Sequence, residues 1–129
     1  MASEGDCKRY PFLANYLNYI LFICSMSFII AYVTHKNVAE AKKVATHLLK
    51  KKMIACANFF PIESMYWWKG KLDSSKEYVS LLKTKKENWK RLESEIKKIH
   101  PYETPCIMKF DVEANEDYEN WIKSESKSY

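Results

Sequence analysis

Glycine is scarce in this sequence, since Gly5 and Gly70 are the only two among 129 residues. Nucleotide-binding fingerprints and phosphate-cradling loops need several glycines at fixed spacing, so the composition excludes both. Arginine is also rare, with Arg9 and Arg91 alone. A loop that holds a phosphate group with glycines and an arginine is therefore not expected.

Close cysteine pairs are also lacking. Cys7, Cys24, Cys56 and Cys106 are too far apart along the chain for a C-x-x-C pair, which excludes zinc-ribbon and thioredoxin-like motifs. An even number of cysteines does not imply a disulfide framework in a chain with this much apolar material. We expect reduced and mostly buried thiols.

The charge balance does not indicate a nucleic-acid partner. The net charge is +5, from 21 basic and 16 acidic residues, and the excess is spread over predicted helices and turns. Nucleic-acid binding calls for a basic stripe with stacking aromatics or a known motif, and the sequence has neither. Solvated helix faces explain the excess.

Residues 1–27 differ from the rest of the chain. No charged side chain lies between Arg9 and His35, and the apolar run is densest at 20–23. Ser25-Met26-Ser27 offers small residues two apart, as a signal-peptidase site needs. We interpret 1–27 as an apolar extension that acts as a secretory signal or membrane anchor, with an accessory helix as the alternative.

Residues 28–129 are predicted to form one α+β domain. The apolar, β-branched run Phe28–Val33 predicts a buried strand. Asn37 is a suitable N-cap for the next helix, and Glu40 has the spacing of a capping box. Lys50–Lys52 close that helix, where cations are favourable at the negative end of the helix dipole.

A long β-hairpin is predicted next. Ile54–Trp68 forms the outgoing arm, in which Pro61 removes one ladder donor. Lys69-Gly70-Lys71 forms the turn, and Tyr78–Thr84 returns. The outgoing arm is far longer than the usual five or six residues of a strand, so one small domain cannot cover it.

Three aromatic residues lie at the tip of this hairpin. Exposed clusters of this kind usually form interfaces, so we expect Tyr66, Trp67 and Trp68 to lie between subunits. Stacking of a ligand is the alternative.

The second half repeats the pattern of helix and strand. Glu87–Ile99 has helical spacing of apolar residues, Cys106–Val112 alternates as a strand, and Asn115 begins a short final helix. The chain from Lys123 onward is expected to fray. His35 and His47, with no partner evident in the sequence, are expected at the surface.

The order of elements is β-α-β-β-α-β with an added C-terminal helix. This is the split βαβ, ferredoxin-like arrangement, an antiparallel sheet with both main helices on one face. The opposite face needs a cover, and self-association is the simplest one.

Several segments, in this order and spacing, resemble the CutA family of divalent-cation tolerance proteins. The resemblance runs from about Phe28 to the C-terminus, roughly four fifths of the chain. The segments that carry it are Ala55-Cys56-Ala57-Asn58, Pro61, Ser64-Met65-Tyr66-Trp67-Trp68-Lys69-Gly70-Lys71-Leu72, Leu82-Lys83-Thr84 and His100-Pro101-Tyr102-Glu103-Thr104-Pro105.

The resemblance implies a homotrimer in the cytoplasm, in which the long hairpins pair with neighbouring subunits. It implies clefts between subunits, as in the similar PII signalling proteins, and a role in tolerance of divalent cations. Bacterial members bind copper, and no catalytic activity or required cofactor is established for the family. The cysteine and the first of two histidines associated with the copper site correspond to Val33 and Ile99, and only His100 is kept.

Four side chains are candidate ligands for copper or another divalent cation. His100, Cys56 and Cys106 offer imidazole and thiolate donors, and Glu103 offers a carboxylate. The alternatives are structural: Cys56 as a small buried residue, and His100 as a group that satisfies the end of a helix. Two further alternatives remain: a weak, adventitious metal site, and a site whose ligands come from different subunits.

The rigid loop between Pro101 and Pro105 offers a candidate cleft. Tyr102 and Glu103 are expected at a subunit boundary near Lys71 or Lys83, as contacts to a small ligand, or else merely in a stiff connection. A nucleophile pair of Cys106 and His100 lacks a third, orienting group, so no enzyme is predicted. A metal-responsive trimer is therefore the first hypothesis, and a structural, partner-binding or anchoring trimer is the second.

Overall fold

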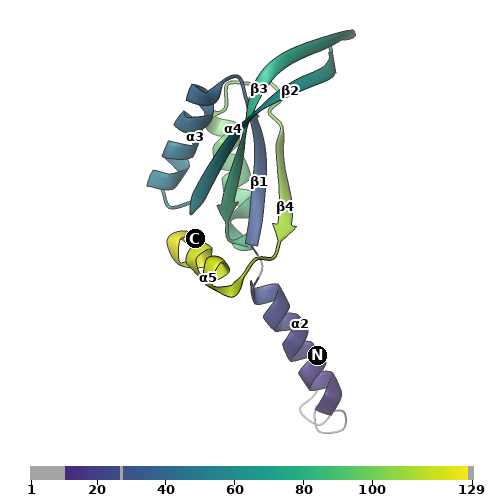
Figure 1. Ribbon diagram of the computed structural model, residues 1–129, viewed down its shortest axis with the longest axis vertical. Helices are drawn as coiled ribbons and strands as arrows, with labels where there is room; N and C mark the ends of the chain where they lie inside the picture. Colours follow the sequence, from purple (N-terminus) through teal and green to yellow (C-terminus); the bar gives the residue numbers. More distant parts are fainter. Residues whose placement is uncertain (1–10, 27, 128–129) are drawn as a thin grey trace.

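The computed structural model describes residues 11–26 and 28–127, and within them one four-stranded antiparallel sheet carries two helices on one face (Figure 1). A third helix crosses one end of the sheet, and another extends beyond that end (Figure 1). The elements are α2 (Pro11–Met26), β1 (Phe28–His35), α3 (Val38–Lys50), β2 (Cys56–Trp68), β3 (Lys71–Thr84), η1 (Lys86–Asn88), α4 (Trp89–Ile99), β4 (Ile107–Val112) and α5 (Glu116–Glu125).

The sheet has the strand order β2-β3-β1-β4. β1 is central and pairs antiparallel with β3 on one side and β4 on the other, with Tyr32 opposite both Leu81 and Met108. This order confirms the predicted ferredoxin-like arrangement, because the two β-α-β halves interleave their strands in one sheet.

Alternation along the strands places the core on the helix-bearing face. Ala31 and Val33 of β1 are fully buried, and they belong to one cluster with Leu48 of α3 and with Leu92 and Ile96 of α4. Successive side chains of a strand point to opposite faces, so the residues between them face away from the helices.

α3 begins at the predicted cap. The Asn37 side chain accepts a hydrogen bond of 2.9 Å from the Glu40 backbone N–H, which satisfies one free donor of the first turn. Near its other end, Lys51 and His47 hydrogen-bond to Glu95 of α4 and lower the pKa of that carboxyl to about 2. His47, predicted at the surface, is half-buried and helps to join the two helices.

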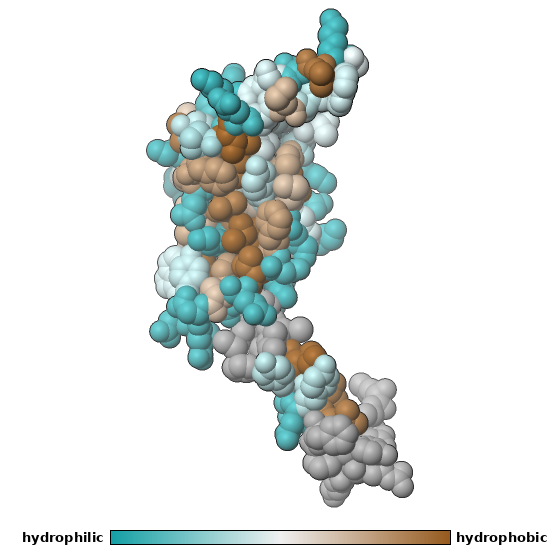
Figure 2. All heavy atoms as spheres, turned by 45° about the vertical axis from the view of Figure 1, so that its right-hand side comes forward, coloured by the Kyte–Doolittle hydropathy of each residue, from teal (hydrophilic) through white to brown (hydrophobic). Residues whose placement is uncertain are grey.

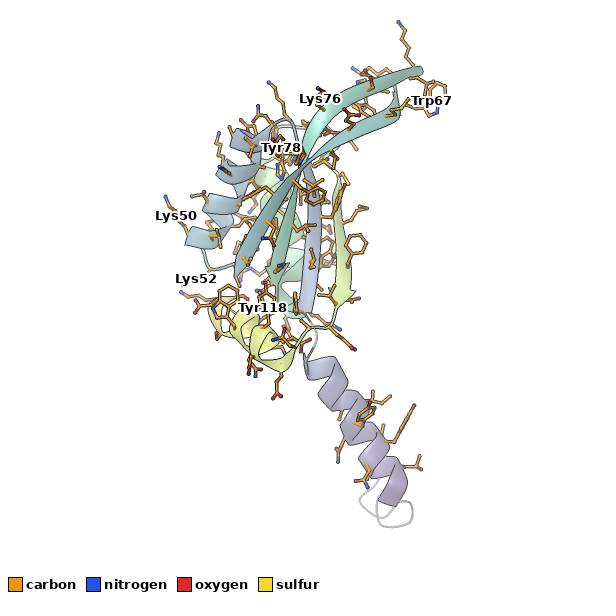
Figure 3. All side chains as sticks on the ribbon, in the orientation of Figure 1. Lys50, Lys52, Trp67, Lys76, Tyr78 and Tyr118 are labelled. Atoms are coloured by element: carbon orange, nitrogen blue, oxygen red, sulfur yellow. The ribbon has the colours of Figure 1, made fainter. Side chains whose placement is uncertain are left out.

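The hairpin is longer than the sequence pattern predicted. β2 and β3 pair without interruption out to Trp68 opposite Lys71, so the return strand begins at Lys71 and not at Tyr78. Main-chain pairing continues through the polar stretch 71–77 because the backbone of β2 provides hydrogen-bond partners along its whole length. Hydrophobic periodicity could not predict this part of the strand, because the stretch is polar. The arm projects past the rest of the sheet, where Figure 3 labels Trp67 and Lys76.

The predicted fraying from Lys123 is wrong. α5 continues to Glu125, and Ser126 is buried. The Lys127 N–H donates to the Lys52 carbonyl at 2.8 Å, and its own carbonyl accepts from the Asn88 side chain at 2.9 Å. Long-range backbone contacts of this kind leave no trace in local polarity.

The sheet face opposite α3 and α4 carries apolar side chains with high exposure. Met108 and Phe110 of β4 are 44% and 50% exposed, and Tyr32 of β1 lies between Leu81 and Met108 on the same face. Figure 2 shows a band of apolar atoms along this side of the domain. We call Tyr32, Leu81, Met108 and Phe110 the open face.

α2 has apolar side chains exposed on several sides. Leu13, Tyr16, Leu17, Tyr19, Ile20 and Leu21 are each at least two fifths exposed. Among the described helices, none has both the length and the apolar character needed to cross a membrane. Residues 1–10 and Ser27 of the predicted extension lie outside the described residues.

Candidate functional site

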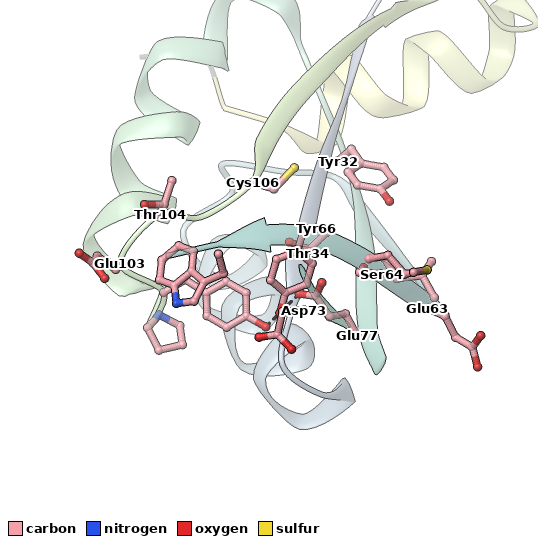
Figure 4. A pocket seen from close by; sticks show the side chains of 15 residues that line it. Tyr32, Thr34, Glu63, Ser64, Tyr66, Asp73, Glu77, Glu103, Thr104 and Cys106 are labelled. Carbon is pink, nitrogen blue, oxygen red and sulfur yellow. Dashed lines mark hydrogen bonds between the residues drawn. The ribbon is translucent and has the colours of Figure 1, made fainter. Parts of the chain in front are cut away.

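A hollow of about 900 Å³ lies where the hairpin leaves the sheet. Its walls come from the facing strands β2 and β3, from the end of β1, and from the loop 101–106 that joins α4 to β4 (Figure 4). Small-molecule sites have volumes of this order. We call it the hairpin pocket.

The lining of the hairpin pocket is acidic and aromatic. Lysine, arginine and histidine are all missing from its described lining, although the chain as a whole is basic. Figure 4 places Asp73 and Glu77 centrally, with Glu103 toward one side and Glu63 extending outward on the other. The carboxylates of the lining are Glu63, Asp73, Glu77 and Glu103, and its aromatic residues are Tyr32, Tyr66, Trp68 and Tyr102.

Glu77 is the one buried carboxylate of the pocket, with 9% of its surface exposed. The Tyr102 hydroxyl donates to Glu77 Oε2 at 3.0 Å. Burial and this hydrogen bond raise the pKa of Tyr102, so the phenol stays protonated and remains a donor. Within the described residues, no basic side chain forms an ion pair with Glu77.

Cys106 lies in the same wall as a half-buried free thiol. Burial and the charge of Glu77 raise the pKa of this thiol, so it is protonated at neutral pH. A metal would have to displace that proton before the sulfur became a ligand.

The prediction of a surface position for His35 is wrong. His35 is fully buried, its Nε2 lies 2.7 Å from Ser80 Oγ, and its Nδ1 has no partner. Its ring stacks on His100 at 5.2 Å between centroids. Burial and the neighbouring His100 lower the pKa of His35 to about 4, so the imidazole is neutral. The sequence could not show this contact, which joins residues 65 positions apart.

Both ring nitrogens of His100 are engaged within the chain. Nε2 lies 2.7 Å from the carbonyl oxygen of Thr34, so it carries the proton and donates. Nδ1 accepts from the Tyr102 backbone N–H at 3.1 Å. The ring therefore fixes the start of the 101–106 loop, and no lone pair is left for a metal ion.

The four predicted metal ligands do not gather within one chain. Glu103 and Cys106 both line the hairpin pocket, whereas Cys56 begins β2 opposite Lys83, on the body of the sheet. In residues 11–26 and 28–127, no group of three or more His, Cys, Asp and Glu side chains is arranged to hold a metal ion. Of the four predicted ligands, only Glu103 and Cys106 therefore share a pocket wall within the described chain.

The predicted cleft residues separate into two sets. Tyr66, Trp68 and Tyr102 line the hairpin pocket. Trp67 is 72% exposed and lies with Lys71 at the tip of the arm. The amine of Lys83 lies outside both sets, because within the chain it donates to the Tyr118 hydroxyl of α5 at 3.0 Å.

Sequence reasoning missed Asp73 and Glu77. Both belong to the polar stretch that was not recognised as strand. In a longer β3, alternation would have placed residues 73, 75 and 77 on one face of the strand. Tyr66, which pairs with Asp73 across the hairpin, would then lie next to that face.

Known proteins with the same architecture are similar over the whole domain. The family model described as "CutA1 divalent ion tolerance protein" matches residues 29–125. The divalent-cation tolerance protein CutA of Pyrococcus horikoshii is 43% identical over 100 residues, covering 77% of this chain and 98% of that protein.

Solved structures agree. The crystal structure of CutA1 from Pyrococcus horikoshii superposes with a TM-score of 0.75 at 44% identity, covering 78% of this chain and 99% of the other. The periplasmic divalent cation tolerance protein CutA from Archaeoglobus fulgidus gives a TM-score of 0.73 at 35% identity, covering 77% and 97%. From β1 to α5, the chain belongs to the CutA1 divalent ion tolerance protein family.

Proposed function

We propose that this protein is a homotrimer, without catalytic activity, that binds copper or another divalent cation through donors from more than one copy. The observation that carries the proposal is membership of the divalent ion tolerance family over residues 29–125. Relatives of this family are named for tolerance of divalent cations.

Self-association is supported by the open face. Met108 and Phe110 are 44% and 50% exposed there in the described chain, and contiguous exposed apolar patches usually mark protein contacts. The projecting hairpin adds unpaired main-chain groups along β2, the edge strand of the sheet, which can pair with a neighbouring copy.

Metal binding is supported by the donors that remain free. Glu103 is exposed and Cys56 is a half-buried free thiol, while Cys106 needs to lose its proton. His100 contributes only if its contacts with Thr34 and Tyr102 are broken. We therefore expect the cysteines and Glu103 to supply most of the affinity.

The test is calorimetric titration of the metal-free protein with Cu²⁺ and, separately, Zn²⁺. Saturable binding with a stoichiometry fixed relative to the trimer is expected. Cys106→Ser and Glu103→Gln should each weaken it about tenfold or more, since even loss of a group that only orients a ligand costs about tenfold. Glu113→Gln is the matched control, because Glu113 is an exposed carboxylate that follows the last residue of β4 and does not line the pocket. Absence of saturable heat with both metals would contradict the proposal.

The second candidate is an anchoring or secretory role for residues 1–27. Apolar side chains exposed on several sides of α2 favour it, because such a helix is unstable in water without a cover. The cytoplasm is the location implied by the sequence resemblance, whereas an Archaeoglobus fulgidus relative is described as periplasmic. Membrane attachment and export are the alternatives for this chain.

Fractionation of cells that express the full chain and a variant lacking residues 1–27 separates these outcomes. Membrane attachment predicts that the full chain sediments with membranes and the truncated form does not. Export with cleavage predicts a mature N-terminus near Phe28 by N-terminal sequencing. An identical distribution of both forms, with an uncleaved N-terminus, would reject both roles.

A further inference from the structure

One side of α2 carries a row of apolar side chains at the spacing of a helix–helix contact. Leu13, Leu17 and Ile20 follow one another at intervals of four and three residues, which places them on one stripe of the helix. Each of the three is at least two fifths exposed in the described chain, and the exposed Tyr16 and Leu21 flank them. We call Leu13, Leu17 and Ile20 the α2 seam.

The side of α2 away from the seam is polar. At about 100° per residue, Asn15 lies roughly 160° around the helix from Leu17, and both Asn15 and Asn18 are exposed. An amide is costly to move from water into an apolar medium where it finds no hydrogen-bond partner. A cover that takes the seam and leaves both asparagines in water therefore fits α2 better than one that surrounds the helix.

The position of α2 places its seam near the contact between copies. α2 extends past the end of the sheet, so its own domain leaves the seam largely uncovered (Figure 1). One residue separates α2 from β1, an inner strand of the sheet whose Tyr32 belongs to the open face. Figure 2 shows apolar atoms of α2 in the same view as the apolar band of the sheet. Copies that meet through their open faces therefore bring their α2 helices toward one another.

Charge and symmetry favour sister copies as the cover. α2 has no charged side chain, so identical helices approach without repulsion, whereas a charged partner finds no group to pair with. Copies related by a rotation axis place the same residue of each chain at the same height, so their α2 helices run parallel and in register. A helix of 16 residues gains most of its stability from packing of its apolar face.

We infer that the α2 helices of the proposed homotrimer pack along their seams into a parallel three-helix bundle beyond the end of the sheets. Leu13, Leu17 and Ile20 of each copy fill the centre of this bundle, and Asn15 and Asn18 face water. The inference rests on the homotrimer but not on metal binding. It is an alternative to membrane attachment and to export of the chain through residues 1–27.

Disulfide cross-linking of the full chain tests the bundle. Leu17→Cys and its control Asn15→Cys are made together with Cys7→Ser and Cys24→Ser, so that the new thiol is the only one in residues 1–27. Under mild oxidation, Leu17→Cys should form interchain disulfides at least about tenfold faster, because only seam positions come within the ~7 Å between Cα atoms that a disulfide allows. Equal rates at the two positions, or no cross-link at position 17, would overturn the inference.

Sedimentation velocity of the same samples before oxidation separates this inference from the homotrimer proposal on which it rests. If the protein is a trimer in which Leu17→Cys does not cross-link, the bundle is refuted and the homotrimer stands. If the wild type is a monomer, both are refuted. A mature chain from the native cell that starts near Phe28 would lack α2, and this result would also refute the bundle.

Hydrogen exchange of the α2 amides gives a second measurement. Leu17→Asp should speed this exchange at least about tenfold, because a charge in the seam opens the bundle, whereas Asn15→Asp should leave it within about twofold of wild type. Equally fast exchange in wild type and Leu17→Asp would contradict the bundle. Vesicles of neutral phosphatidylcholine test the other cover: if the α2 amides are protected only when these vesicles are present, lipid covers the seam and the inference fails.

Discussion

Replacing Phe110 by aspartate should dissociate the proposed homotrimer. Phe110 lies on the open face with half of its surface exposed in the single chain. A phenylalanine presents roughly 200 Å², so about 100 Å² per copy is available for burial on assembly, which contributes about 2.5 kcal/mol at ~25 cal/mol per Å². Three copies lose about 7.5 kcal/mol, which lowers the association constant by more than about 10⁵-fold before the cost of burying a carboxylate is added.

Sedimentation velocity at micromolar concentration measures this effect directly. We expect wild type to sediment as a trimer and Phe110→Asp as a folded monomer with an unchanged far-ultraviolet circular dichroism spectrum. Leu49→Asp is the matched control, because Leu49 is 39% exposed but lies on α3, on the other side of the sheet. A trimeric Phe110→Asp variant, or dissociation by Leu49→Asp alone, would refute the assignment of the open face as the interface.

Three further predictions concern stability and ligand chemistry. His35 is buried and neutral with a pKa of about 4, so between pH 6.5 and 4 the unfolded chain binds a proton there that the folded chain does not. The free energy of unfolding should therefore fall by about 3 kcal/mol per chain from pH 6.5 to 4. Denaturant titrations should show a flatter pH profile for His35→Gln, with His47→Gln as the control. Leu48→Ala should cost about 2–5 kcal/mol of unfolding free energy, and Leu49→Ala less than about 1, because only Leu48 is fully buried; equal midpoints in urea would contradict this. The affinity for Zn²⁺ should rise by up to about tenfold per pH unit from pH 6 to 8, because the thiol pKa of Cys106 is raised and metal binding must release the thiol proton. If the affinity of the wild type does not depend on pH, that thiol is not a ligand.

Local patterns determined most of the fold. The buried run that begins at Phe28, the Asn37 cap and the helix that ends before Pro101 all lie where the sequence predicts them. These signals are local, since they depend on side-chain periodicity and on backbone groups within a few residues. Their order was enough to predict the β-α-β-β-α-β sheet.

The candidate site was only partly predictable. Tyr66, Trp68, Tyr102, Glu103 and Cys106 were predicted as functional residues and do line one pocket. The sequence could not show that Cys56 and Lys83 lie elsewhere, because their separation depends on where β2 and β3 pair.

Tertiary structure alone decided the chemistry of the two histidines and of Glu77. His35 loses its proton because the fold removes it from water and stacks it on His100, and both nitrogens of His100 are used by main-chain groups. Glu77 is buried because the fold brings β3 beside Tyr102, which donates a hydrogen bond to its carboxylate. Residue types fix what a side chain can do, but burial and long-range partners fix its charge and its free lone pairs, and these arise only when distant segments meet.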